Sequence, residues 1–211
     1  MNNKIKTIST VIFFGAVWGI IEATVGYVLH FLPIYIAGTI LFPIVSFLLY
    51  KAYTITKSRS SLLAIGGIAA AIKAINFFMP FGSPFKIINP MLSIILESMM
   101  VLVVVSLLSK DDMKSKATGF IVASIGWRAM YLLYNGIQFA TTGYVSDYLV
   151  TFYTAIEFTV LFGLLSAAIA YGVHYLDMKA TNSSRKNSFQ GISPYVSFAT
   201  LAVAIVLTIF A

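Results

Sequence analysis

The sequence predicts an all-α fold, a polytopic membrane helix bundle, and three observations lead to this prediction. Hydrophobic residues make up 59% of the 211 residues and charged residues only 10%, whereas a soluble domain carries about 25% charged residues. Apolar runs of about 20 residues, long enough to cross the hydrocarbon core as helices, recur along the chain. Most charged residues lie in the short segments between these runs. We therefore expect a single transmembrane domain over residues 1–211.

Seven apolar runs have the length of a membrane-spanning helix. They cover residues 8–30, 32–54, 61–79, 90–108, 117–141, 147–176 and 194–211. The first run follows the basic start MNNKIK, but it is too long for the apolar core of a signal peptide and lacks a small-residue cleavage site. We expect it to remain as the first helix. If the last run lies only at the membrane interface, the number of spans falls to six.

The segments between the runs differ in character. Only FLP, around Pro33, separates the first two runs, which predicts a close antiparallel helix pair. The stretch MPFGSPFKIINP, residues 79–90, holds three prolines and a glycine and predicts a loop of restrained shape, a candidate lid. Residues 178–193 are polar and rich in Ser and Asn, which predicts a flexible cytoplasmic loop.

Basic residues fall in alternate segments and so predict the orientation in the membrane. The segments before the first run, and after the second, fourth and sixth, hold Lys4, Lys6, Lys51, Lys57, Arg59, Lys110, Lys114, Lys116, Lys179, Arg185 and Lys186. The remaining segments hold only Lys86 and Asp147. Because basic loops stay in the cytoplasm, we expect a cytoplasmic N-terminus in a multi-pass protein of the bacterial plasma membrane. The net charge of +7 then reflects topology and contact with anionic lipid, and no nucleic-acid partner is expected.

Five ionisable residues lie well inside predicted helices. They are Glu22, Lys73, Glu97, Arg128 and Glu157. Each costs about 2.5–3.5 kcal/mol at the centre of a membrane helix unless it is paired or hydrated. At a rise of about 1.5 Å per residue, all five fall roughly 9 to 20 Å below the outer surface. They come from five different helices, and we expect them to meet in one polar layer around a cavity that opens outward.

Neighbouring polar residues extend this layer along the helices. Arg128, Tyr131, Asn135 and Gln138 follow one helical face, and Tyr153 shares a face with Glu157. The predicted substrate-binding residues are Glu22, His30, Lys73, Asn76, Glu97, Trp127, Arg128, Tyr131, Asn135, Gln138, Tyr153 and Glu157. The alternative is that these groups only tie helices together through buried ion pairs and hydrogen bonds. The second and seventh runs bring no charge to the layer, and we expect them to be lipid-facing or scaffold helices.

Gly15, Gly19 and Ala23 form a stripe of small residues spaced by four on the first predicted helix. The stripe lies about 100° around the helix from Glu22 and Gly26. Such a stripe packs against another helix of the same chain or docks a separate membrane subunit. The second use makes Gly15, Gly19 and Ala23 candidate partner-docking residues.

A small all-helical chain with a polar outer cavity and the stretch GAVWGIIEA resembles the substrate-binding S component of energy-coupling factor (ECF) transporters. In that family, small residues spaced by four on the first helix dock the transmembrane coupling subunit. The resemblance covers the overall plan and this one motif. It implies capture of a vitamin-like molecule from outside, with toppling of the subunit in the membrane driven by a shared coupling subunit and two ATPases. Ligand residues vary with the substrate in that family, so none is transferred.

The chain lacks several kinds of catalytic chemistry. It has no cysteine, no HExxH, no Gly-x-Ser-x-Gly and no P-loop, so we expect no catalytic residue, metal site or cofactor, and any ATPase activity would belong to partners. A solute-binding subunit that captures a small vitamin- or cofactor-like molecule is the first hypothesis. An intramembrane enzyme acting on a lipid or prenyl substrate, with Glu22, Glu97 or Glu157 as acid or base, is the second. A structural membrane subunit is the third.

Overall fold

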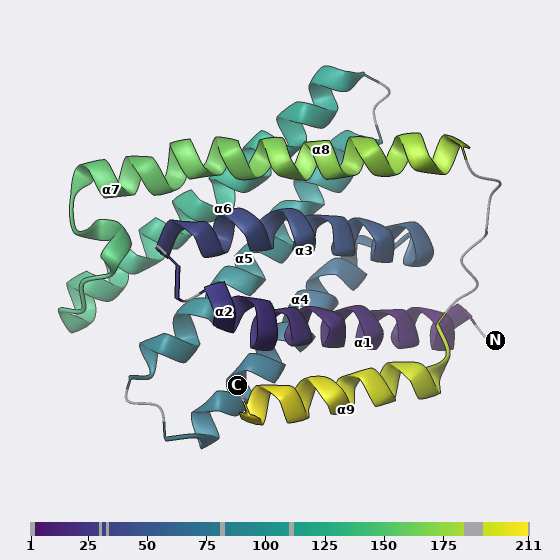
Figure 1. The fold of residues 1–211 in the computed structure, drawn as a ribbon, viewed down its shortest axis with the longest axis horizontal. Coiled ribbons are helices and arrows are strands. Elements are labelled where there is room, and N and C mark those ends of the chain that lie inside the picture. The colour runs from purple at the N-terminus through teal and green to yellow at the C-terminus, as the bar shows by residue number, and fades with distance from the viewer. Residues whose placement is uncertain are drawn as a thin grey trace.

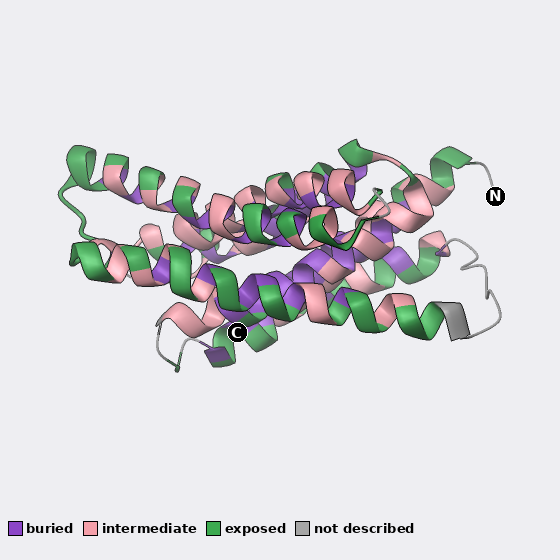
Figure 2. Cartoon of the chain, turned by 90° about the horizontal axis from the view of Figure 1, so that it is seen from above, coloured by how far each residue is buried: buried purple, intermediate pink, exposed green. Residues whose placement is uncertain are grey.

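The computed structural model describes residues 3–29, 31–32, 34–80, 83–109, 112–183 and 192–210, and these are helical almost throughout, with no strand among them. The long helices lie side by side in one bundle, with α3 between α8 and α1, and α9 along the outside of α1 (Figure 1). Buried residues follow the inner faces of the helices and exposed residues the outer faces (Figure 2). The predicted all-α helix bundle is confirmed.

The helices have the following bounds. The first rod consists of α1 (Asn3–Ile21), the π-helix η1 (Glu22–Gly26) and α2 (Tyr27–Leu29). It is followed by α3 (Ile34–Thr56), α4 (Arg59–Ala74), the 3₁₀ turn η2 (Ile75–Phe78), α5 (Phe85–Leu108) and α6 (Met113–Thr142). The last part holds the 3₁₀ turn η3 (Asp147–Leu149), α7 (Phe152–Ile156), the π-helix η4 (Glu157–Leu161), α8 (Phe162–Ser183) and α9 (Pro194–Phe210).

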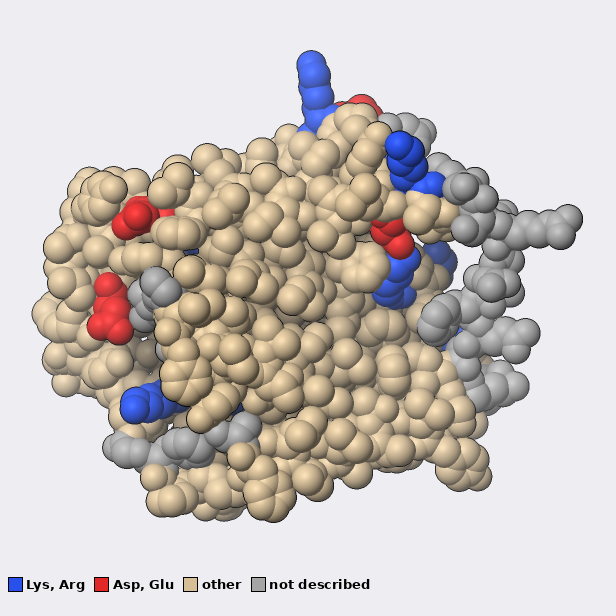
Figure 3. Space-filling view, in the orientation of Figure 1, with Lys and Arg blue, Asp and Glu red and all other residues tan. Residues whose placement is uncertain are grey.

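Five helices are long and apolar enough to cross a membrane. They span Asn3–Leu29, Tyr35–Thr56, Arg59–Phe78, Phe85–Leu108 and Phe152–Thr181. Large apolar side chains stand exposed on outer faces, among them Ile8, Leu133 and Leu176, as expected of lipid-facing surface. On the face shown in Figure 3, charged side chains lie toward the two ends and at the upper edge, and the centre of the face carries none. The chain is a helical membrane protein; the count of seven spans and the cytoplasmic N-terminus stay predictions.

Helix α6 is 30 residues long, yet it is not among the five helices that pass on length and apolarity. Its polar residues Ser124, Arg128, Asn135 and Gln138 are all buried, so they face the interior of the bundle. The Asp112 side chain caps its start by accepting a hydrogen bond from the Ser115 N–H at 2.6 Å. Gly143, with a φ of 73°, ends it in the left-handed conformation that glycine adopts readily.

The structure refines three expectations about individual segments. Helix α5 begins at Phe85, so the second half of the proposed lid at 79–90 is helix, with Pro90 inside it. Helix α8 continues to Ser183, so 178–183 of the predicted flexible loop are helical, and residues 184–191 lie outside the described residues. For the second run, expected to be a lipid-facing or a scaffold helix, the scaffold role is the one that α3 shows, because Phe42, Val45 and Leu49 are fully buried.

The small-residue stripe of α1 packs within the chain. A Cβ added to Gly15 would lie 2.7 Å from the Ile68 side chain, and one added to Gly19 would lie 2.8 Å from Ile72. The two glycines therefore allow α1 to lie directly against α4, and Ala23 is also buried. Of the two uses expected of the stripe, Gly15 and Gly19 serve the first, packing against a helix of the same chain, because α4 occupies their face; Ala23 lines the cavity described below, and docking of a separate subunit stays a prediction.

Replacing Gly15 with alanine should destabilise the bundle. The new methyl group meets the branched part of Ile68, close to its backbone, so the two helices have to separate, and overpacking of this kind costs about 1–3 kcal/mol. Thermal unfolding in detergent, followed by circular dichroism, should show a lower midpoint. Gly67→Ala is the matched control because nothing lies within 4 Å of the added Cβ. Equal melting of the two variants would contradict the close contact.

Candidate functional site

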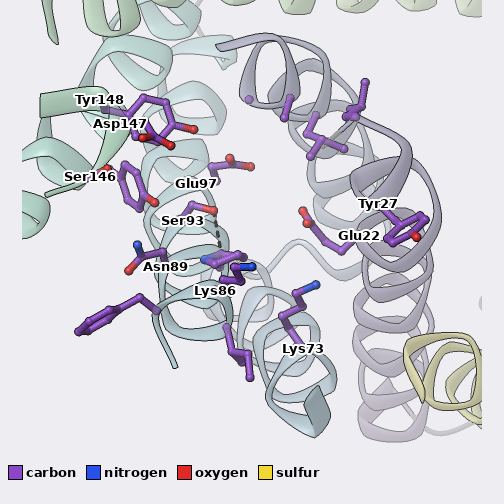
Figure 4. Close-up of a pocket in the computed structure, with 18 of the residues that line it drawn as sticks. Glu22, Tyr27, Lys73, Lys86, Asn89, Ser93, Glu97, Ser146, Asp147 and Tyr148 are labelled. Atoms are coloured by element: carbon purple, nitrogen blue, oxygen red, sulfur yellow. Dashed lines mark hydrogen bonds between the residues drawn. The ribbon is translucent and has the colours of Figure 1, made fainter. Parts of the chain in front are cut away.

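A cavity of about 660 Å³ opens at the end of the bundle where α2, η2 and η3 lie. This volume falls within the range of small-molecule sites. Its walls come from the first rod, α3, α4, η2, α5, α6, η3, η4 and α9. Five charged residues line it, namely Glu22, Lys73, Lys86, Glu97 and Asp147. The cavity thus gathers charges from α4, α5, η1 and η3 into one space (Figure 4).

One wall of the cavity is a continuous face of α5. Lys86, Asn89, Ser93 and Glu97 line it, at spacings that keep them on one side of a helix. Lys86 lies in the first turn, and eleven residues separate it from Glu97, which corresponds to about 16 Å along the axis. Lys86 is exposed and Glu97 is only 4% exposed. The cavity therefore has a mouth beside Lys86 and a deep end beside Glu97.

The deep end combines one carboxylate with aromatic rings. Trp127, Tyr131 and Phe158 line the cavity together with Glu97. The Glu97 Oε2 atom and the Trp127 Nε1 atom are both buried without a hydrogen-bond partner among the described residues. A Cβ added to Gly38 would lie 3.1 Å from the Trp127 ring, so the glycine lets this ring pack closely against α3. The walls of the deep end thus hold a buried acceptor and a buried donor that no described residue satisfies.

Arg128 lies behind this end and does not line the cavity. Its side chain is fully buried, and Nη1 donates to the Ser124 carbonyl oxygen at 2.9 Å and to Ser124 Oγ at 2.7 Å. The guanidinium carbon lies 4.5 Å from the Trp127 ring centroid and 5.6 Å from that of Phe158, within the range of a cation–π contact. Arg128 therefore supports the aromatic wall from behind and places positive charge next to it.

The mouth carries both signs of charge. In Figure 4, the carboxylates of Glu22 and Glu97 point into the cavity from opposite walls, and the Lys73 side chain reaches toward the same space. Trp18 Nε1 donates to Glu22 Oε1 at 3.2 Å. Glu22 also begins the π-helix η1, a distortion often found at functional sites, and Gly26 leaves room for its carboxylate, because a Cβ there would lie 3.3 Å from Oε2.

Two further predicted residues make hydrogen bonds behind the walls, Gln138 between helices and Asn135 within α6. Gln138 Nε2 donates to Asn89 Oδ1 and to the Tyr134 hydroxyl, both at 3.1 Å, which ties α6 to α5. Asn135 Nδ2 donates to the Tyr131 carbonyl oxygen at 2.7 Å. Both side chains are buried but neither lines the cavity.

Of the predicted site residues, the structure brings half to the cavity. Those that line it are Glu22, Lys73, Asn76, Glu97, Trp127 and Tyr131. Arg128, Asn135 and Gln138 lie behind its walls, and His30 lies outside the described residues.

Two further predicted site residues, Tyr153 and Glu157, do not line the cavity. Tyr153 is 71% exposed, and Phe158, the residue after Glu157, faces the interior. Phe158 packs against Tyr148 at a centroid distance of 4.2 Å and against Trp127 at 5.9 Å. This aromatic packing sets the rotation of the helix and turns the face that carries Tyr153 and Glu157 away from the cavity.

Several lining residues were not predicted from the sequence. Lys86, Asn89, Ser93, Ser146, Asp147 and Tyr148 line the cavity. The sequence could have indicated Lys86 and Asp147 as lining residues, since they are the two charged residues of the segments assigned to the outer side. Nothing in the sequence indicates Tyr148, because its position depends on how the segment after α6 folds back over the bundle.

The ion pairing of the described residues lies away from the cavity. Within the described part of the chain the ion pair is Lys51–Asp177, at 2.6 Å, near the ends of α3 and α8 that lie away from the cavity. Lys73, Glu97 and Arg128 take no part in it. Comparison with protein-family models, curated proteins and solved structures finds no match, so the site itself carries the functional argument.

Because the chain has no cysteine, access to the cavity can be measured with single cysteines. Ser93→Cys should react with a membrane-impermeant maleimide added outside intact cells, since Ser93 lines the cavity below its mouth. Ser98→Cys on the same helix is the control and should stay unmodified, because Ser98 is fully buried and does not line the cavity. Labelling is read by a mass shift. Equal labelling of both positions, or labelling of Ser98→Cys alone, would exclude this cavity.

Proposed function

We propose that this chain is the membrane-embedded solute-binding subunit of an uptake transporter, of the ECF S-component type. It captures a small vitamin- or cofactor-like molecule in the cavity and docks to a separate coupling and ATPase module. The observation that carries the proposal is the buried Glu97 side chain, which lines the cavity and whose Oε2 atom has no hydrogen-bond partner among the described residues. Burying such an acceptor is unfavourable unless a ligand or water supplies the missing hydrogen bond.

The distribution of basic residues supports an outward-facing cavity. Lys73, Lys86 and Arg128 lie at or behind the cavity, whereas the other basic residues of the sequence fall in the segments that we assign to the cytoplasm. The mouth then opens on the extracytoplasmic side, where an uptake system meets its substrate. The cavity crosses only part of the bundle, which suits capture by this chain and release driven by partners.

Docking to a coupling subunit needs a surface other than the small-residue stripe, since Gly15 and Gly19 pack against α4. Other apolar faces remain exposed on α6, α8 and α9, for example at Leu133, Leu176 and Phe198. Co-purification of the tagged chain from its native membrane tests this part of the proposal.

An intramembrane enzyme is the second candidate. Glu97 and Glu22 approach the cavity from opposite walls, an arrangement that can supply a general acid and a general base. Turnover of a lipid or prenyl substrate by the isolated chain would favour this candidate over capture alone.

Glu97→Gln should reduce retention of the native ligand, because it removes a buried charge that faces the cavity while conserving its shape. Losing a hydrogen bond to a charged group costs about 1.5–3 kcal/mol, or roughly 10- to 150-fold in affinity. Native mass spectrometry of the gently purified protein measures the bound fraction.

Glu157→Gln provides the matched control for this measurement. It is the same substitution at a glutamate that does not line the cavity, and retention should stay unchanged. Loss of ligand in Glu157→Gln but not in Glu97→Gln would overturn the site, and wild-type protein with no bound small molecule after purification from its native membrane would count against capture.

A further inference from the structure

We infer that the end of the bundle that holds the mouth of the cavity is a lipid-contact surface, and that the mouth lies in the headgroup layer of the adjacent leaflet. Molecules that occupy the cavity then enter and leave through this layer and not directly from bulk water. The inference concerns the surroundings of the mouth. It holds whatever molecule the cavity binds, so it stands apart from the proposed function.

The turns around the mouth expose large apolar side chains. Phe31 follows the first rod, Phe78 ends η2 and Phe152 begins α7, and they are 77%, 88% and 83% exposed. Both α2 and α7 lie at this end of the bundle (Figure 1). The mouth surface consists of these three residues and of the exposed Tyr27, Val28, Leu32, Phe77, Tyr144, Val145, Val150 and Tyr153. Apolar surface of this kind marks a contact with a membrane or with another protein.

The mouth surface carries little charge, which favours lipid as the group that covers it. Lys86 and Asp147 are the charged residues of the segments between the apolar runs on this side, whereas most basic residues lie in the segments at the opposite end. A surface that meets bulk water or a soluble partner is expected to have a polar rim. Exposed tyrosines, of which the mouth surface has three, are typical of the membrane–water interface because their rings are apolar and their hydroxyls polar.

The height of the mouth surface above the basic end matches the thickness of a bilayer. Along α4 and η2, Phe78 lies nineteen residues from Arg59, or about 29 Å. Along α8 and α7, Phe152 lies twenty-seven residues from Lys179, or about 40 Å. The hydrocarbon core is about 30 Å thick and the whole bilayer about 40–45 Å. With the basic residues at one boundary of the core, the mouth surface therefore falls within the headgroup layer at the other.

The rim of the cavity belongs to the mouth surface. Tyr27, Leu32 and Tyr144 are exposed and also line the cavity. Phe85, at the start of α5, lines it too and packs on Tyr144 with 4.7 Å between ring centroids. A molecule that reaches the charged interior has to pass these side chains. It therefore passes through the layer that surrounds them.

Fluorescence quenching in lipid nanodiscs measures the depth of the mouth surface. Because the chain has no cysteine, single cysteines can carry a bimane label at exposed positions, where replacement leaves the core intact. Phe78→Cys and Phe152→Cys report on the mouth surface, Leu165→Cys on the lipid-facing side of α8, and Thr181→Cys on the opposite end. The quenchers are iodide in the water, a phospholipid with a nitroxide on its headgroup, and one with a nitroxide near the end of an acyl chain.

We expect the headgroup nitroxide to cause the largest loss of emission at both Phe78→Cys and Phe152→Cys. The acyl-chain nitroxide should quench Leu165→Cys most, and iodide should quench Thr181→Cys most. Strongest quenching by iodide at Phe78→Cys or Phe152→Cys would overturn the inference, because the surface would then face water, as one kept for a soluble partner does. Strongest quenching by the acyl-chain nitroxide at either position would also overturn it, by placing the mouth in the hydrocarbon core. The proposed function is tested separately, by retention of the native ligand.

Discussion

The free energy of a charged group inside an apolar bundle is the constraint on which the rest of this structure depends. A charged side chain at the centre of a membrane helix costs several kcal/mol unless it faces a partner or a polar space. Glu22, Lys73 and Glu97 meet this requirement by lining one cavity. Arg128 meets it in part, through Ser124 and two aromatic rings, while its Nε and Nη2 atoms have no hydrogen-bond partner among the described residues. Because these charged side chains must point toward a partner or the cavity, they restrict how α1, α4, α5 and α6 are rotated about their axes. The apolar faces of the same helices then point outward.

The close packing of α1 on α4 affects the shape of the cavity, because both helices lead to charged residues that line it. Gly15 and Gly19 bring the two backbones together through Ile68 and Ile72, and the next turns of the same helices carry Glu22 and Lys73 to the cavity. The π-helix that starts at Glu22 changes the direction of the side chains that follow. The stripe predicted to meet a partner thus has an internal role, since it sets the distance between two walls of the cavity.

The sequence predicts the fold class and the chemistry of the layer, but not the rotation of every helix. Composition and apolar runs are enough to predict a helical membrane bundle. The position of each residue along its helix is enough to predict that Glu97, Trp127 and Tyr131 lie at a similar depth. The direction of the Glu157 side chain could not be predicted from the sequence, because it depends on the packing of Phe158 against rings from α6 and η3. That packing is a tertiary contact. The periodicity of one helix defines which residues share a face but not where that face points.

The molecule allows a comparison between an ion-paired charge and the buried acid that lines the cavity. Lys51 and Asp177 lie on α3 and α8 and meet at 2.6 Å, which is how a pair that joins two helices is expected to look. Glu97 is far more deeply buried than either, at 4% exposure against 35% and 21% for the two side chains, and one of its oxygens has no partner among the described residues. A buried acid kept only to join helices would gain from a close partner, and Arg128 directs Nη1 to Ser124 instead. The geometry therefore favours a ligand as the group that Glu97 is placed to meet.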